Sequence, residues 1–309
     1  MESGAFEVRQ DSFPVLRLER SICLGLPCFV MCLRNSSLYL RYFGESGRVR
    51  SNEDLLREVR SLFEPVERVL GGLSQWRFLQ GQENGYFCEH TFMTLVVLWN
   101  NPEFVELDGN SKEILLWTML FHDLWKRGSP LLPCRDPFHP FSSAAKALEV
   151  FVEHGLVDKR SGVEGFCEFI MNSYVLKYTR TEIMDLGKIE EIYKGLLYYS
   201  GVSDRLDSEF GSFVEVEALN SEFKRFFFEV LVLILFHQSL ELNNRFMNTC
   251  NLNVWQVKRY LSKRMVHFLY IVHHADHNSY NVGYHNINEY PNDAQIKENA
   301  KRYLALFDT

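Results

Sequence analysis

Apolar residues recur at helical spacing along most of the chain. Leu55, Leu56, Val59 and Leu62 follow a polar capping signal at Ser51–Asp54. Apolar positions three and four residues apart lie on one face of a helix, so this spacing predicts an amphipathic helix. The same pattern predicts further helices at about 88–100, 111–126, 141–155, 163–177, 187–200, 216–243, 253–276 and 292–307.

The N-terminal segment has a different pattern. Residues 13–48 contain short apolar runs, and Asn35-Ser36-Ser37 separates two of them. Turn-forming residues between two such runs are typical of a β-hairpin. We therefore expect a small β-rich cap at 1–50 and an α-helical domain at 51–309. The predicted fold class is mainly α, a helical bundle with a short N-terminal β-rich cap.

Composition and charge narrow the class of partner. The chain has 309 residues, 46% of them hydrophobic and 24% charged, and its 25 Phe indicate a core packed with aromatic rings. The formal net charge of −7 argues against broad binding to nucleic acid, which usually needs a basic surface. A local basic pocket for a small phosphorylated ligand remains compatible with this charge.

The compartment is expected to be the cytoplasm, without membrane association. Met1–Glu7 lacks the basic and apolar regions of a signal peptide. The longest apolar run, Phe226–Phe236, is too short to span a bilayer. Seven Cys fit a reducing environment, and the clustered Cys23, Cys28 and Cys32 match no familiar zinc signature.

A His-Asp pair ends one of the predicted buried helices. His122 and Asp123 follow the apolar run Ile114–Phe121, and Lys126 comes three residues after Asp123. A carboxylate in an apolar setting needs a partner that compensates its charge. A divalent cation does so and also suits a neutral imidazole, so the pair predicts a metal site.

Further His and Asp residues occur in a recognisable order around this pair. His90 opens an apolar stretch upstream, His139 precedes a small-residue helix, and Asp276 follows an apolar helix near the C-terminus. In this order the chain resembles the HD-domain superfamily of metal-dependent phosphohydrolases over roughly 86–280. The stretch His122–Leu156 is most similar to the HD region of tRNA nucleotidyltransferases and RNase Y-type enzymes.

The resemblance implies a mixed nitrogen and oxygen ligand set on a divalent ion. His90, His122, Asp123 and Asp276 are the expected ligands, and Mn²⁺, Fe²⁺, Co²⁺, Ni²⁺ and Zn²⁺ all suit them. The implied reaction is hydrolysis of a phosphoester by a metal-activated water, in a nucleotide or another small phosphorylated substrate. Asp123, Lys126 and His139 are the expected catalytic residues, the last two as groups that hold phosphate or stabilise the leaving group.

Several assignments stay open at the level of sequence. Asp136 and Asp204 are alternatives to Asp276, although both lie in turn-rich segments. His139 is either a hydrogen-bond donor to the substrate phosphate or a ligand to a second metal. Dinuclear relatives carry another His on the next helix, where this chain has Asn172, which argues against a second ion.

The remaining His are expected to be structural or to support the ligands. His154 fits a helix cap, whereas His237 and His267 fall in apolar helices. One of the His residues around Asp276, namely His273, His274 or His277, is a candidate for fixing a ligand from outside.

Two other functional classes compete with the hydrolase. One is a di-iron oxygenase of the myo-inositol oxygenase type, which resembles this helical architecture but needs six protein ligands. Only five can be nominated from the sequence. The other is a non-catalytic HD-like regulatory module that works through binding, and metal content would separate these three possibilities.

Overall fold

The computed structural model describes residues 90–91, 94–95, 97–98, 100–125, 139–173, 186–206, 222–240, 252–279 and 293–308. These residues are mainly helical and contain no strand, which confirms the α class for this part of the chain. The predicted β-rich cap at 1–50 lies outside the described residues. The helices are α7 (Pro102–Val105), α8 (Gly109–Phe121), α9 (His139–Glu153), α10 (Val163–Asn172), α11 (Leu186–Tyr199), α13 (Glu222–Phe236), α14 (Val254–Tyr260), α15 (Lys263–Ser279) and α16 (Asp293–Ala305).

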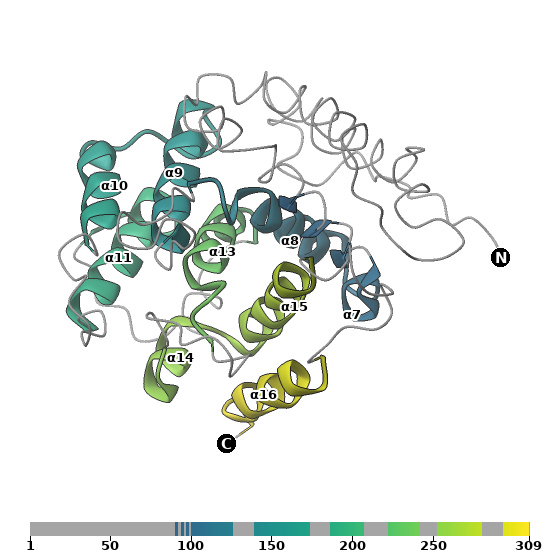
Figure 1. Ribbon diagram of the computed structural model, residues 1–309. Helices are drawn as coiled ribbons and strands as arrows, with labels where there is room; N and C mark the ends of the chain where they lie inside the picture. The colour runs from purple at the N-terminus through teal and green to yellow at the C-terminus, as the bar shows by residue number, and fades with distance from the viewer. Residues whose placement is uncertain are drawn as a thin grey trace, which may run out of the picture.

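Helix α13 is the centre of the bundle. It packs against α8, α9, α11 and α15, and α15 in turn packs against α8 and α16 (Figure 1). Its sequence explains this position, because every residue of the run Phe226–Phe236 is buried. A helix that is apolar all round is stable only when other elements surround it.

Aromatic rings fill the contact between α8, α9 and α13. Trp117 makes edge contacts with Phe151 and Phe227, each with ring centroids 5.7 Å apart. Phe151 also meets Phe121 at 5.4 Å and Phe227 at 4.9 Å. These offset and edge geometries suit the ring quadrupoles. Phe121, a member of this cluster, directly precedes the His-Asp pair, so the cluster holds the end of α8 in place.

An ion pair between a partly exposed arginine and a buried glutamate connects α13 with α15. Both carboxylate oxygens of Glu229 accept hydrogen bonds from one guanidinium nitrogen of Arg264, at 2.5 and 2.6 Å. The Glu229 side chain is 1% exposed, so its charge needs this partner. The pair fixes the relative position of two helices that carry candidate site residues at their C-terminal ends.

One predicted helix is two in the structure. The sequence pattern predicted a single helix over 253–276, whereas α14 ends at Tyr260 and α15 begins at Lys263. Leu261 is extended, with φ −126° and ψ 151°, and the hydroxyl of Ser262 accepts a hydrogen bond from the backbone N–H of Met265. Because Leu261 is also buried, the apolar periodicity continues through the break and conceals it.

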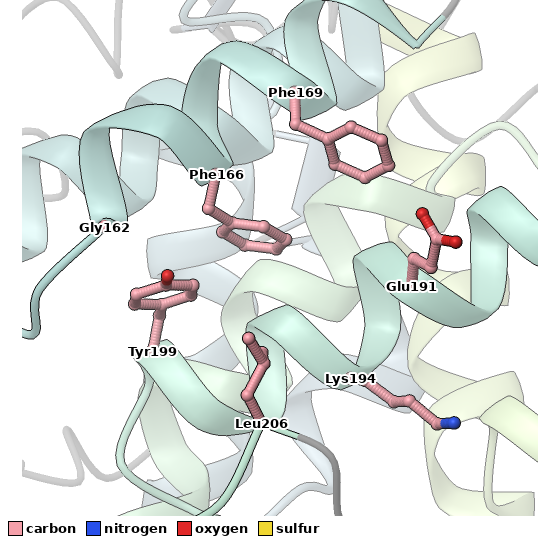
Figure 2. A pocket seen from close by; sticks show the side chains of 7 residues that line it. All are labelled: Gly162, Phe166, Phe169, Glu191, Lys194, Tyr199 and Leu206. Atoms are coloured by element: carbon pink, nitrogen blue, oxygen red, sulfur yellow. The ribbon is translucent and has the colours of Figure 1, made fainter.

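Helices α10 and α11 approach closely at Gly195. A Cβ atom at this position would lie 2.0 Å from Cε2 of Phe166, whose ring stacks on Tyr199 with centroids 4.8 Å apart. A cavity of about 350 Å³ opens beside this contact (Figure 2). Its lining residues are Gly162, Phe166, Phe169, Glu191, Lys194, Tyr199 and Leu206.

Replacing Gly195 with alanine should destabilise the protein although alanine is the better helix former. Alanine gains about 1 kcal/mol of helix propensity, but displacing the Phe166 ring costs about 1–3 kcal/mol. The matched control is Gly165→Ala on α10, where a Cβ atom would meet nothing within 4 Å and the propensity gain should remain. Urea unfolding measures both variants. Equal midpoints for the two would contradict the close packing.

The carboxyl of Glu113 on α8 should make stability depend on pH. Burial raises the pKa of Glu113 from 4.5 to about 7, although a hydrogen bond from Trp117 opposes the shift. The folded protein therefore binds this proton more tightly than the unfolded chain, and the associated stability is lost as pH rises through 7. Glutamine resembles the protonated carboxyl. At pH 8, Glu113→Gln should thus raise the free energy of unfolding by on the order of 3 kcal/mol, and with it the melting temperature. At pH 4 the free energy of unfolding should change little.

Glu190→Gln on α11 is the control of opposite sign. A hydrogen bond from Lys194 lowers the pKa of Glu190, so its stabilising charge is present at pH 8. The pair is partly exposed and contributes less than about 1 kcal/mol. The variant should be slightly less stable than wild type at pH 8. A thermal-unfolding series from pH 4 to 9 that gave both variants the same pH profile would refute the assignment to Glu113.

The described helices include none whose length and apolar character suffice to cross a membrane.

Candidate metal centre

Two buried polar residues lie directly after the end of α8, inside the bundle. His122 follows directly after α8 and is 0% exposed, and Asp123 is 1% exposed. The apolar residues of α8 hold this end in the core, so neither side chain can reach bulk water. Charge on Asp123 must therefore be compensated by neighbouring groups.

Three residues from distant segments form the first of two groups. Nε2 of His90 lies 3.0 Å from Oδ1 of Asp276 and 3.4 Å from Nε2 of His122. Nε2 of His122 lies 3.6 Å from the same Asp276 oxygen. Helix α15 contributes Asp276, and all three side chains are buried. The three ligand-type atoms face one point.

A second group lies on the other side of Asp123. Oδ1 of Asp123 is 2.8 Å from Nε2 of His139, the first residue of α9. Nε2 of His139 is in turn 3.2 Å from Nε2 of His237, which follows α13. All three residues are buried and present one ligand-type atom each to a common point.

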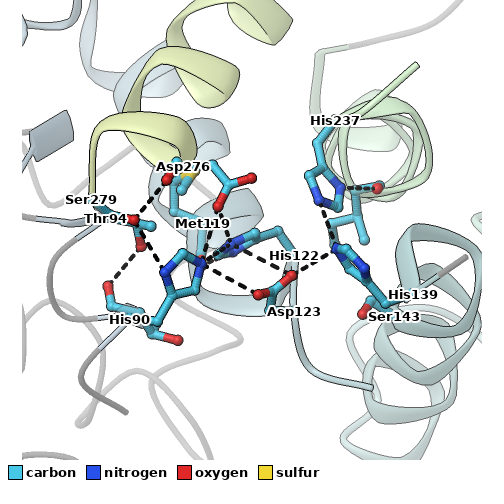
Figure 3. Close-up of polar contacts among 12 residues, drawn as sticks. His90, Thr94, Met119, His122, Asp123, His139, Ser143, His237, Asp276 and Ser279 are labelled. Carbon is cyan, nitrogen blue, oxygen red and sulfur yellow. Dashed lines mark hydrogen bonds and ion pairs between the residues drawn. The ribbon is translucent and has the colours of Figure 1, made fainter. Parts of the chain in front are cut away.

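Asp123 connects the two groups. Its Oδ2 lies 3.3 Å from Nε2 of His90, while its Oδ1 faces His139. Figure 3 shows the carboxylate between the imidazoles of the first group and those of the second. We call the six residues His90, His122, Asp123, His139, His237 and Asp276 the six-residue centre.

Hydrogen bonds on the outer side orient three of the imidazoles. Nδ1 of His122 donates to the carbonyl of Met119 at 2.7 Å, and Nδ1 of His237 donates to the carbonyl of Ile234 at 2.7 Å. Nδ1 of His90 lies 3.1 Å from the hydroxyl oxygen of Ser279. With the ring proton on Nδ1, each neutral imidazole presents the Nε2 lone pair to the centre, as a metal ligand does.

The spacing of these nitrogens fits a metal ion. Two neutral imidazoles with their lone pairs directed at each other repel unless a cation or proton lies between them. Metal–nitrogen bonds of about 2.0–2.1 Å at angles of about 90–110° place two ligand nitrogens about 3.0–3.4 Å apart. The observed separations of 3.4 Å for His90 and His122 and 3.2 Å for His139 and His237 match this range. The buried His and Asp residues can therefore hold metal ions.

The electrostatics of the first group couple His90 to both carboxylates. Burial by itself would lower the pKa of His90, but hydrogen bonds and charge from Asp123 and Asp276 outweigh burial and raise it. Burial likewise opposes ionisation of Asp276, yet His122 and His90 hold the pKa of this carboxyl well below its usual range. A proton on His90 thus compensates carboxylate charge in the metal-free protein, and a bound cation would replace that proton.

The second group is suited to neutral imidazole. Burial, together with the neighbouring His139 and His122, lowers the pKa of His237 to about 3. The His237 ring is therefore uncharged at neutral pH, and its Nε2 lone pair is available for an ion.

The structure brings together five of the residues nominated from the sequence and adds one. His90, His122, Asp123, His139 and Asp276 converge. Lys126 and the alternative Asp136 lie outside the described residues. Asp204, the other alternative, has a 91% exposed side chain paired with Arg160, far from the burial that the centre requires.

The sequence-based interpretation of His237 as a structural core residue missed its neighbours. Asn172, the position of a further His in dinuclear relatives, is exposed at the end of α10, whereas His237, directly after α13, lies beside His139. The available signal was a His directly after the buried run Phe226–Phe236, the same arrangement as His122 after α8. His267 lies within an apolar helix instead, where it pairs with Glu103 at 2.7 Å and is 32% exposed.

The His residues near Asp276 have separate environments. Burial lowers the pKa of His273 to about 4, and its ring stacks on His277 with centroids 6.0 Å apart. Nδ1 of His274 lies 3.3 Å from the side-chain amide nitrogen of Asn101. Ser279, which was not nominated from the sequence, contacts Nδ1 of His90, whereas Asp276 of the same segment contacts Nε2.

Comparisons of the chain with protein-family models, with curated proteins and with solved structures found no match. Function must therefore be inferred from the chemistry of the centre itself.

Proposed function

We propose that the chain is a metal-dependent phosphohydrolase that acts on a nucleotide or another small phosphorylated substrate. The observation that carries the proposal is the convergence of four imidazoles and two carboxylates on two adjoining points, with Asp123 between them. The order of His90, His122-Asp123, His139 and Asp276 along the chain also resembles that of the HD-domain phosphohydrolases, and His237 is an addition to this order.

With two divalent ions bound, the six-residue centre would have a net positive charge. Four neutral imidazoles and two carboxylates contribute two negative charges, fewer than the charge of two divalent ions. When bound, such ions supply charge that polarises a phosphoryl oxygen and acidifies a water molecule. An anionic phosphoester matches this excess charge better than a neutral substrate. Mn²⁺, Fe²⁺, Co²⁺, Ni²⁺ and Zn²⁺ all suit the mixed donors.

The side chains of the centre would hold and separate the ions. Asp123 would contribute one oxygen to each group, which keeps the two positions adjacent. His139 is close enough to Asp123 to serve as a ligand or, in a one-ion form, to donate a proton to the carboxylate or a substrate oxygen. Lys126 remains the proposed cation for substrate phosphate.

The test is elemental analysis of protein purified without chelator, followed by a screen of phosphorylated metabolites for phosphate release. The proposal expects close to two transition-metal ions per chain and phosphate release that chelator abolishes and added metal restores. Protein that is folded but contains no metal and binds none after addition would refute it and favour the regulatory module.

His237 specifically favours a second candidate, the di-iron oxygenase of the myo-inositol oxygenase type. This class needs six protein ligands, and His237 raises the number of converging residues from five to six. Iron as the dominant metal, with oxygen consumption on a cyclic polyol and no phosphate release from any phosphoester, would select the oxygenase over the hydrolase.

Metal addition should stabilise the folded protein whichever chemistry it supports. An ion that binds the assembled centre but not the unfolded chain contributes about 2.7 kcal/mol at a concentration of 100 Kd. Chelator-treated protein should therefore melt at a lower temperature than the same protein with Co²⁺ or Mn²⁺, whereas Mg²⁺, which prefers oxygen ligands, should have a smaller effect. A melting temperature indifferent to all three ions would contradict the site.

A further inference from the structure

Ser279 contacts two members of the first group at once. Its hydroxyl donates to the backbone carbonyl of Asp276 at 2.6 Å, and its oxygen lies 3.1 Å from Nδ1 of His90 (Figure 3). The residue is 5% exposed, so water does not readily replace either contact. Because the hydroxyl proton is already committed to the carbonyl, the oxygen is the acceptor and Nδ1 of His90 is the donor.

This arrangement distinguishes His90 from the other oriented imidazoles. His122 and His237 each donate to a carbonyl three residues earlier in the same chain segment, which no substitution can remove. His90 depends on a side chain 189 residues away. Its inner nitrogen, moreover, faces both Asp123 and Asp276, which favour a proton on Nε2. Without an acceptor at Nδ1, the tautomer with the proton on Nε2 is favoured, and in this tautomer Nε2 cannot bind an ion.

We propose that Ser279 is a positioning residue that keeps the proton of His90 on Nδ1 and thereby leaves Nε2 for a metal ion. Its contact with the Asp276 carbonyl also ties this imidazole to the turn of α15 that carries the carboxylate ligand. The inference rests on the proposed function only in taking the six-residue centre as a metal site. It applies equally to the hydrolase and to the oxygenase.

The test is a Co²⁺ titration of chelator-treated protein, followed by the absorbance of the bound ion. Ser279→Ala should weaken the affinity for one of the bound Co²⁺ ions by about 10- to 100-fold, the usual effect of removing an outer partner of a ligating His. The matched control is Ser200→Ala, directly after α11. Ser200 is also buried and also donates to the carbonyl three residues earlier, at 3.4 Å, but it belongs to another part of the bundle. Its loss should leave Co²⁺ affinity unchanged.

A double-mutant cycle separates positioning from a general structural role. If Ser279 acts through His90, Ser279→Ala should add nothing to the loss of affinity already caused by His90→Ala. Additive losses would show that Ser279 acts by another route and would overturn the proposal. Wild-type affinity in a folded Ser279→Ala protein would overturn it too, whereas wild-type protein that binds no Co²⁺ would refute the metal centre itself.

A measurement on the unaltered protein covers the case in which Ser279→Ala does not fold. Long-range proton–nitrogen correlation spectra of the Zn²⁺-loaded wild-type protein report which ring nitrogen of each His carries the proton. The proposal expects the His90 proton on Nδ1 and the metal on Nε2. The opposite assignment would overturn it.

Discussion

Asp123→Ala should eliminate metal binding to both groups of the centre and reduce turnover to the background of the metal-free protein. Of the two carboxylates in the six-residue centre, Asp123 is the one with an oxygen facing each group, at 3.3 Å from His90 and 2.8 Å from His139. Its removal takes a ligand and a negative charge from both positions at once. The loss should exceed the roughly 10- to 100-fold effect of removing an outer partner.

The fold should survive this change, because Asp123 is compensated by imidazoles, which can lose their proton, rather than by a permanently charged guanidinium such as that of Arg264 at Glu229. Far-UV circular dichroism checks the fold, and elemental analysis with Co²⁺ titration checks the metal. Asp204→Ala is the control, since Asp204 is a carboxylate whose side chain is 91% exposed. An Asp123→Ala protein with stoichiometric metal and full turnover would remove the basis of the site assignment.

The helices were predictable where apolar residues recur at helical spacing. The positions of α8, α9, α10, α11 and α16 follow the apolar spacing to within a few residues of their ends. The break before α15 was not predicted because Leu261 and the residues around it are buried on both sides of the interruption. Periodicity reports burial, and burial continued where the backbone turned.

The candidate centre was predictable where residues carry chemistry in a recognisable order. His90, His122, Asp123, His139 and Asp276 were nominated on that basis and converge. His237 and Ser279 were not nominated, because their positions beside the other residues depend on the packing of α13 and α15 against α8, which the sequence does not show. The β-rich cap and Lys126 stay predictions, since both lie outside the described residues.

His237→Ala should remove one ion of the two and most of the activity while leaving the first group able to bind metal. The His237 ring is 2% exposed, is held by the Ile234 carbonyl, and directs Nε2 to His139 at 3.2 Å. His90, His122 and Asp276 do not depend on it for their mutual contacts. The metal content measured by elemental analysis should therefore fall toward one ion per chain. Wild-type protein should contain about two, as expected from the two groups around Asp123.

The informative control is His267→Ala, because sequence patterning alone treats both His residues alike. His267 also lies in an apolar helix, but its Nε2 donates to Glu103 on α7 at 2.7 Å and its side chain is 32% exposed. Losing a partly exposed pair of this kind changes stability by about 1 kcal/mol or less. Metal content and turnover should stay at wild-type values in His267→Ala. If wild-type protein instead bound a single ion and His237→Ala retained it, the second group would not be a metal position. The chain would then have a one-ion centre in which His139 acts on the substrate, and the oxygenase would lose its sixth ligand.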